Sequence, residues 1–187
     1  MYAEKLPPHD VEAEEAVIGS LLIDGQAIHK ISTFLKPEDF YTEKNRWCYE
    51  ACMSLFQGQE AINQVTVAYE LSNQSHLEGL GGMASLSHLV ASVPTSVHIE
   101  NYGRIVSRTS AMRQLIRAAG EIAAIGYEGV QDVDTAIGRA EDALFHIRTS
   151  SQVRGFVTLR NVLDQWMEEK AASQGGLDQA VAPILTG

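Results

Sequence analysis

The sequence has few cysteines, few positive charges and no long apolar run, and each shortage excludes a class of protein. Its only cysteines, Cys48 and Cys52, lie four residues apart in a helical pattern, where two thiols are poorly placed for a disulfide. Their CxxxC spacing also differs from the CxxC of thiol oxidoreductases and zinc ribbons, so we expect two buried core thiols. No apolar stretch approaches the roughly eighteen residues of a membrane-spanning helix, and the first residues lack a secretory signal, so the expected location is cytoplasmic.

Lysine and arginine are outnumbered by acidic residues. The chain carries 14 Lys and Arg against 24 Asp and Glu, a net charge of −10. Residues 1–95 hold five of the basic and thirteen of the acidic residues, so most of the excess lies in the first half. An acidic surface repels a phosphate backbone, so we expect little direct DNA contact and a preference for protein partners.

The motifs of cofactor and metal chemistry are missing as well. No GxxxxGK[ST] phosphate loop is present, and the sequence contains no Gly-Lys pair at all. Residues 79–84 match GxGxxA, but no strand precedes them, so they predict a turn rather than a dinucleotide site. The six histidines show neither HExxH nor a Cys/His ligand spacing. We therefore expect no catalytic residue, cofactor or metal in this chain.

What the sequence does contain is helical periodicity, which predicts an all-α fold. We expect a small helical head over residues 1–93, with helices at 10–23, 26–35, 42–56, 65–72 and 83–93 and a Gly-rich loop at 78–82. Gly25 and Gly58 are expected to end the first and third of these helices. Residues 65–67 alone could form a strand, but no segment of comparable β character is available to pair with it.

Residues 94–150 predict a protruding antiparallel helical hairpin. No proline occurs between Pro94 and Gly129, and a helix of roughly thirty residues is about 45 Å long. Residues 94–96 are expected to cap it, and Gly126 and Gly129 to turn the chain near residues 127–132. The second helix carries a heptad-like seam, which consists of Val133, Ile137, Ala140, Leu144 and Ile147.

The outer half of the long helix has more apolar surface than one neighbour can cover. On a helical wheel of residues 111–127, apolar and small residues fill roughly 180°, whereas packing on one partner needs about 100°. The polar face is Arg113, Gln114, Arg117 and Glu121. We expect another copy of the chain to cover the excess; the alternative is that the head folds back onto it. The predicted subunit-interface residues are Met112, Leu115, Ile116, Ala119, Ile122, Ala123, Ile137 and Leu144.

Residues 151–187 read as a linker with a docking helix at about 158–173. One apolar stripe on this helix has nothing to bury against nearby, and it is therefore expected to dock elsewhere. The docking residues are Leu159, Val162, Leu163, Trp166 and Met167. The last residues, after Gly175-Gly176, lack a stop signal and suggest a chain cut in mid-connection.

An ordered set of short motifs resembles the N-terminal part of the bacterial or phage replicative DNA helicases of the DnaB family. The set begins with Leu6-Pro7-Pro8-His9-Asp10-Val11-Glu12-Ala13-Glu14, continues with Leu35-Lys36-Pro37-Glu38-Asp39-Phe40-Tyr41, and closes with Ile184-Leu185-Thr186-Gly187. Two positions depart from the family pattern. Asn63 follows Ile62 where the family usually has Asp, and Ser85 stands where an aromatic residue is usual.

The resemblance implies an assembly and primase-docking module. In that family the head and hairpin form a collar, dimerised through hairpins and closed into a hexamer as a trimer of dimers, which binds primase. The linker helix would dock on the motor domain of a neighbouring subunit. ATP, Mg²⁺ and the 5′–3′ helicase activity would belong to a motor domain beyond Gly187, so this fragment would not itself be an enzyme.

Two other hypotheses remain open from the residues alone. The first is a free-standing all-α oligomerisation or adaptor module with no motor, which reading the gene past codon 187 would test. The second is a small thiol-dependent enzyme using Cys48 and Cys52, which the accessibility of the two thiols would test.

Overall fold

The computed structural model describes residues 6–128 and 132–151, except for the side chains of 146 and 148–151. The chain separates into two compact units, Met1–Val153 and Arg154–Gly187, and the described residues belong to the first. Every regular element in the described ranges is helical, which confirms the predicted all-α fold. The expected linker helix with Leu159, Val162, Leu163, Trp166 and Met167 lies outside the described residues.

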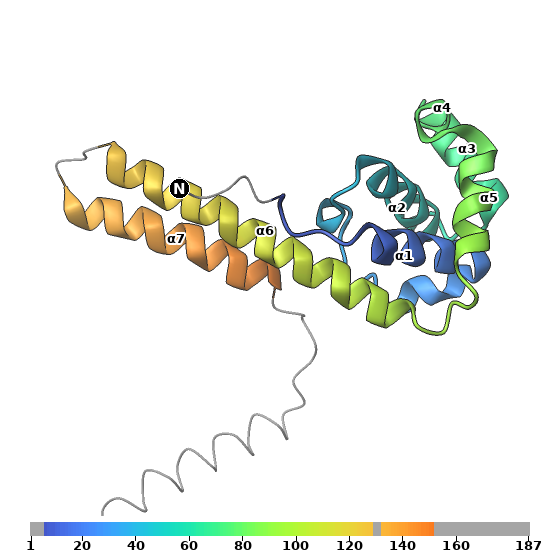
Figure 1. Ribbon diagram of the computed structural model, residues 1–187, viewed down its shortest axis with the longest axis horizontal. Helices are drawn as coiled ribbons and strands as arrows, with labels where there is room; N and C mark the ends of the chain where they lie inside the picture. The colour runs from blue at the N-terminus through green and yellow to red at the C-terminus, as the bar shows by residue number, and fades with distance from the viewer. Residues whose placement is uncertain (1–5, 129–131, 152–187) are drawn as a thin grey trace, which may run out of the picture. The chain divides into compact units, whose positions relative to one another are not determined.

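The head is built around one central helix, α1 (Val11–Ile23) (Figure 1). It contacts α2, α3, α5, α6 and the first 3₁₀ helix, so its side chains Val17, Ile18 and Leu21 are completely buried. The remaining head elements are η1 (Gly25–Lys30), η2 (Pro37–Asp39), α2 (Glu43–Gln57), α3 (Gln64–Asn73), α4 (Leu77–Leu80) and α5 (Gly82–Ser92).

Side-chain caps explain where two of these helices begin. Asp10 caps α1, since its Oδ1 accepts a 3.0 Å hydrogen bond from the Ala13 N–H. Asn63 caps α3 by accepting from the Val65 and Thr66 N–H groups, and Thr66 Oγ1 accepts from the Asn63 N–H at 3.0 Å. Residues 65–67 are therefore helical, and the strand alternative is wrong.

The expected boundaries need correction in three places. α1 ends at Ile23 with Asp24 as its C-cap, and Gly25 begins η1, so the helix expected at 26–35 is a 3₁₀ helix followed by turns. The loop expected at 78–82 contains the short helix α4. Gly81 and Gly82 then have φ of +107° and +71°, which favours glycine. The turn predicted over residues 79–84 is confined to Gly81, because α4 ends at Leu80 and α5 begins at Gly82.

The hairpin consists of α6 (Ile99–Tyr127) and α7 (Val133–Ser151), which run antiparallel (Figure 1). The expected cap at residues 94–96 is wrong, because the residue that precedes α6 is His98 and no side chain caps it. Thr95 Oγ1 instead accepts from the Val97 N–H at 3.2 Å. Gly126 lies inside α6 rather than in the turn, and residues 129–131, including Gly129, lie outside the described ranges.

Candidate functional site

α6 turns one face to the head along its first half and a different face to α7 along its second half. Its buried positions in the first half recur at Ile99, Gly103, Val106 and Ser110, the spacing of a single stripe. Farther along, Ala118 is buried and Ile122 and Ile125 are half-buried, again at helical spacing. At about 100° per residue, the second stripe is rotated from the first by roughly 100°. One helix is therefore shared by two neighbours.

A third face of α6 is left exposed, and it is apolar. Met112 is 45% exposed, Leu115 43% and Ile116 58%, and the smaller Ala119 and Ala123 are also exposed. We call these five residues the hairpin stripe. Neither the head nor α7 covers them, so the alternative that the head folds back onto this face is wrong. Their role as a subunit interface stays a prediction.

The other predicted interface residues, Ile122 on α6 and Ile137 and Leu144 on α7, differ in exposure. Ile122 is half-buried in the stripe turned toward α7, whereas Ile137 is 52% exposed and Leu144 47% exposed. Of the heptad-like seam, Val133 is also exposed, to 65%, whereas Ala140 and Ile147 are half-buried. The half-buried positions of α7 include Ala136, Ala140, Ala143 and Ile147, two of which belong to the seam.

The difference between the half-buried and the exposed positions of α7 has a physical reason. Small side chains let two helices approach closely, so an alanine stripe can make the intramolecular contact while larger apolar residues stay outside. At the far end of the hairpin, Arg139 Nη1 lies 2.7 Å from Glu128 Oε2 and links the two helices across their exposed edge. The larger apolar side chains Ile137 and Leu144 therefore remain available to a second partner.

The polar contact between head and hairpin centres on Arg113, which the helical wheel placed on the polar face. Its Nη1 donates a 2.9 Å hydrogen bond to the Pro8 carbonyl, and its Nη2 donates to the Asp39 carbonyl. Its guanidinium lies 5.6 Å from the centroid of the Tyr41 ring. Tyr41 in turn stacks on His9, with the ring centroids 4.4 Å apart. Arg113 thereby joins α6 to two separate stretches of the head, the segment before α1 and residues 39–41.

The carboxylate of Asp39 completes this contact. Asp39 Oδ1 accepts from Ser110 Oγ at 2.7 Å, and Oδ2 accepts from the Lys36 N–H at 2.8 Å. Burial raises the pKa of Asp39, and the hydrogen bond from Ser110 opposes that rise. Pro8, His9, Asp39, Tyr41, Ser110 and Arg113 together are called the joint below. No local pattern could identify it, because its head residues are about 70 to 105 positions away from their partners on α6.

Glu14 supports the joint from inside the head. Its side chain is completely buried and accepts hydrogen bonds from the Tyr41 N–H at 2.7 Å, the Thr42 N–H at 3.1 Å and Asn45 Nδ2 at 3.2 Å. A buried carboxylate requires such partners, since it has lost its hydration. The three donors hold the start of α2, and with it the Tyr41 ring, in place.

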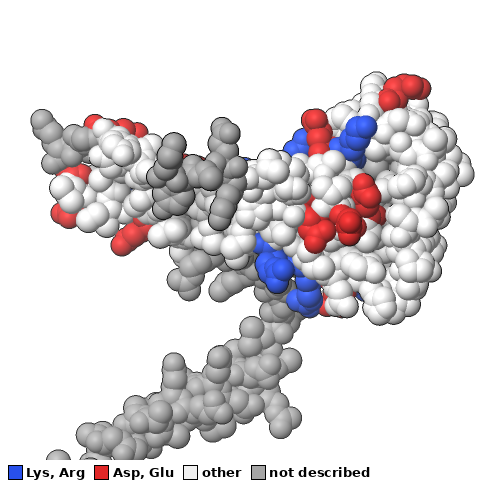
Figure 2. Space-filling view, viewed as in Figure 1, with Lys and Arg blue, Asp and Glu red and all other residues white. Residues whose placement is uncertain are grey.

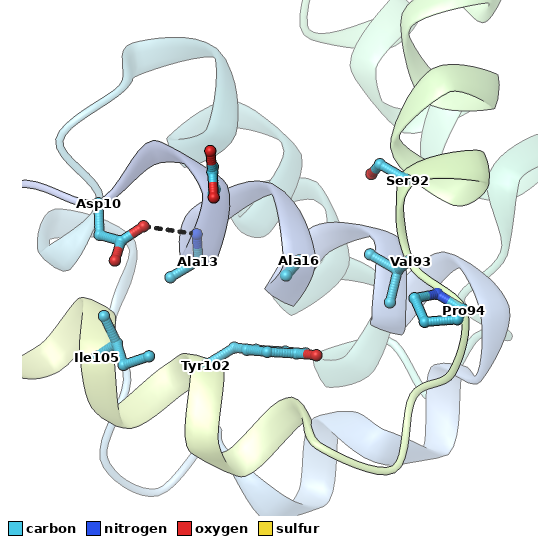
Figure 3. A pocket seen from close by; sticks show the side chains of 9 residues that line it. Asp10, Ala13, Ala16, Ser92, Val93, Pro94, Tyr102 and Ile105 are labelled. Carbon is cyan, nitrogen blue, oxygen red and sulfur yellow. Dashed lines mark hydrogen bonds between the residues drawn. The ribbon is translucent and has the colours of Figure 1, made fainter.

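A hollow of about 310 Å³ lies where α1, the end of α5 and α6 meet (Figure 3). Apolar side chains, including Val93, Tyr102 and Ile105, form its floor, and Asp10 and Glu12 stand at its edge. Glu12 is exposed and has no ion pair within the described ranges. Acidic side chains are visible on the head in the view of Figure 2. The hollow suits an apolar side chain that is flanked by positive charge.

The two cysteines are buried in the head. Both thiols are completely inaccessible, which confirms that they are core residues. Burial raises the pKa of Cys48 to about 12 and raises the pKa of Cys52 as well. These thiols do not suit the thiol-dependent enzyme hypothesis, because the nucleophile in such enzymes is an accessible thiolate.

No three His, Cys, Asp or Glu side chains of the described ranges are grouped so that they could hold a metal ion. No described helix combines the length and the apolar character needed to cross a bilayer. The features with functional potential are therefore surfaces: the hairpin stripe, the joint and the hollow beside α1.

Comparison with known proteins supplies the family. Residues 6–108 match the family described as DnaB-like helicase N terminal domain. The replicative DNA helicase DnaB of Geobacillus stearothermophilus is 33% identical over 165 residues, which cover 88% of this chain and 36% of that protein. The replicative DNA helicase DnaC of Bacillus subtilis is 35% identical over 162 residues, with 87% and 36% covered. The chain thus spans little more than a third of the length of these relatives.

Solved structures agree with this match. The crystal structure of the N-terminal domain of DnaB helicase from Mycobacterium tuberculosis has a TM-score of 0.72 and 32% identity, covering 76% of this chain and 99% of that chain. A structure described as a DnaB-like replicative helicase and its interactions with primase has a TM-score of 0.68. At 24% identity, over 89% of this chain and 37% of that one, it shows the fold alone. The family match covers more than half of the chain, and the chain therefore belongs to the DnaB-like helicase N-terminal domain family.

Proposed function

We propose that this chain is the N-terminal assembly and primase-docking module of a replicative DNA helicase, and that its copies associate through the hairpin. The observation that carries the proposal is the hairpin stripe, in which Met112, Leu115 and Ile116 are 43% to 58% exposed although they are apolar. Membership of the family supports a role in DNA replication, since the curated relatives are replicative DNA helicases.

The energetics favour association of the hairpins. Burying a large aliphatic side chain completely contributes about 1.5–3 kcal/mol, so covering the exposed half of each of these three residues contributes about 1 kcal/mol per residue and per copy. A two-fold contact would apply the stripe of each copy to its partner and double this contribution. Ile137 and Leu144 on α7 would extend the same interface.

In the whole protein, such dimers would close as a trimer of dimers into a hexameric collar. The linker residues Leu159, Val162, Leu163, Trp166 and Met167 would dock on the motor domain of a neighbouring subunit. ATP and Mg²⁺ would be bound by that motor domain and not by this module, which would act in the cytoplasm without catalysing a reaction. Reading the gene beyond codon 187 tests this part, because the helicase proposal requires a GxxxxGK[ST] stretch there.

Primase is the proposed partner of the head. A relative of the same fold is described together with its interactions with primase. On this chain the hollow beside α1 offers an apolar floor and the exposed carboxylate of Glu12. It would accept an apolar side chain of the primase that lies next to a lysine or arginine. Direct DNA contact would be slight, because the head is acidic.

The test of assembly is the mass of the 187-residue chain in solution. Leu115→Asp and Ile116→Asp place a charge within the hairpin stripe and should lower the mass measured by light scattering. Arg117→Asp introduces the same carboxylate on an exposed position that points away from the stripe, and it should leave the mass unchanged. Circular dichroism checks that the helices persist. An equal mass for the parent chain and both stripe variants would refute the hairpin interface.

A further inference from the structure

The direction of the hairpin depends on how the head holds one helix. α6 is continuous from the head into the hairpin, so there is no loop between them that could act as a free connection. Its first half rests closely on the head: a Cβ at Gly103 would lie 3.2 Å from Ile31 Cγ2 and 3.3 Å from the Phe34 ring. These contacts are apolar, and apolar contacts by themselves allow a helix to slide or rotate slightly.

The joint supplies the directional contacts at the middle of α6. Arg113 binds the carbonyls of Pro8 and Asp39 and covers the Tyr41 ring, while Ser110, one turn earlier, binds the Asp39 carboxylate. A guanidinium presents its donors in a rigid planar fork, so two carbonyl acceptors fix its orientation. The contacts therefore resist rotation of α6 about its own axis as well as tilting.

The position of Arg113 along the helix makes this resistance effective. About 20 Å of α6 extends from Arg113 to Tyr127. A tilt of about 10° at the joint would therefore move the far end of the hairpin by roughly 4 Å. Arg113 is also adjacent to Met112, the first member of the hairpin stripe. A change at the joint would thus displace the stripe relative to the head.

We propose that Arg113 is a positioning residue, which holds the N-terminal segment and η2 against α6 and so sets the direction in which the hairpin leaves the head. The consequence for assembly rests on the proposed function of the hairpin stripe. The positioning itself does not, because it concerns distances within one chain. Residues 6–9 accordingly take part in the contacts that orient the hairpin, although they precede the first helix.

The experiment measures the distance between head and hairpin by double electron–electron resonance. Spin labels are attached at Glu60→Cys in the head and Tyr127→Cys at the end of α6, both exposed positions. The native thiols are buried, so the parent chain should take up no label. Labelled chains are diluted with unlabelled chains, so that only distances within one chain are recorded.

Arg113→Gln should at least double the width of the distance distribution. Arg113→Lys retains a donor and a charge but lacks the fork, so its width should lie between those of the parent and Arg113→Gln. Arg117→Gln, an exposed arginine one turn farther along α6, is the matched control and should match the parent. An Arg113→Gln distribution as narrow as that of the parent would overturn the proposal, and so would equal broadening by Arg117→Gln.

A second variant tests the same contact without changing Arg113, in case Arg113→Gln misfolds. Deleting residues 1–8 removes the Pro8 acceptor and leaves the Asp10 cap of α1 intact. It should also broaden the distribution, and combining it with Arg113→Gln should add less than the sum of the two changes, because both act on one contact. Strict additivity would contradict the proposal. Broadening with an unchanged oligomer mass would support the joint and count against the hairpin interface.

Discussion

Arg113 on α6 donates a 2.9 Å hydrogen bond to the carbonyl of Pro8, 105 residues earlier in the chain. The two residues belong to a helix of the hairpin and to the segment before the first helix of the head, respectively. Their contact makes head and hairpin parts of one packed structure rather than two domains joined by a flexible segment. Since a module that assembles through its hairpin must present its head at a defined angle, this contact bears directly on the proposed function.

Replacing Glu14 by Gln should destabilise the head. The buried carboxylate accepts three hydrogen bonds, and an amide of the same shape turns one acceptor oxygen into a donor that faces an N–H group. We expect the free energy of unfolding in urea to fall by about 1–3 kcal/mol. Glu15→Gln, at the next position and without a hydrogen bond in the described ranges, should change it little. Equal losses for the two variants would contradict this account.

The pH dependence of stability should carry a contribution from Asp39. Its pKa is raised above the ordinary 3.8 by burial, so in the window just above pH 3.8 the folded protein holds a proton that the unfolded chain releases. The contribution of Asp39 to stability should therefore grow as the pH falls through this window and shrink as it rises. The difference in unfolding free energy between the parent and Asp39→Asn, measured at several pH values, isolates this slope. The opposite slope would show that hydrogen bonding to the ionised form outweighs burial.

Two neighbouring alanines of α6 should respond in opposite ways to the same enlargement. Ala118 is 4% exposed within the contact between α6 and α7, so Ala118→Leu should push the helices apart and cost about 1–3 kcal/mol of stability. Ala119 is exposed in the hairpin stripe, and Ala119→Leu should leave thermal stability of the monomer unchanged. It adds apolar surface to the proposed interface and should increase the oligomer mass. If Ala118→Leu is tolerated as well as Ala119→Leu, the assignment of faces is wrong.

The cap of α3 provides a test of the departure from the family pattern. Asn63 accepts from two N–H groups at the start of the helix, so Asn63→Ala should lower the free energy of unfolding by about 0.5–2 kcal/mol. Asn63→Asp restores the residue usual in the family and keeps an acceptor oxygen at the cap, so it should be neutral or stabilising. Thermal unfolding of the two variants and the parent measures these differences. Equal melting temperatures for Asn63→Ala and the parent would contradict the capping role.

Much of the fold was readable from local pattern. Apolar spacing predicted the helical nature of every described element except the short η2 and α4, and the hairpin was predicted because proline is missing from one long periodic stretch. Element boundaries were less accurate at residues 24–35 and 94–98. There the outcome depends on which polar groups cap the chain, and several candidates stand close together in the sequence.

Which face of a helix meets which neighbour was decided by tertiary structure. Helical spacing identified the apolar residues of α7, but it could not separate the exposed Val133, Ile137 and Leu144 from Ala140 and Ile147, which are half-buried. Likewise, spacing placed Arg113 on a polar face, and only the folded head brings the Pro8 and Asp39 carbonyls to it. Periodicity depends on residues within a few turns, so the sequence by itself determined the helices and the family. Partners far apart in the chain are chosen by close packing and by the need to satisfy buried polar groups, and these exist only in the folded molecule.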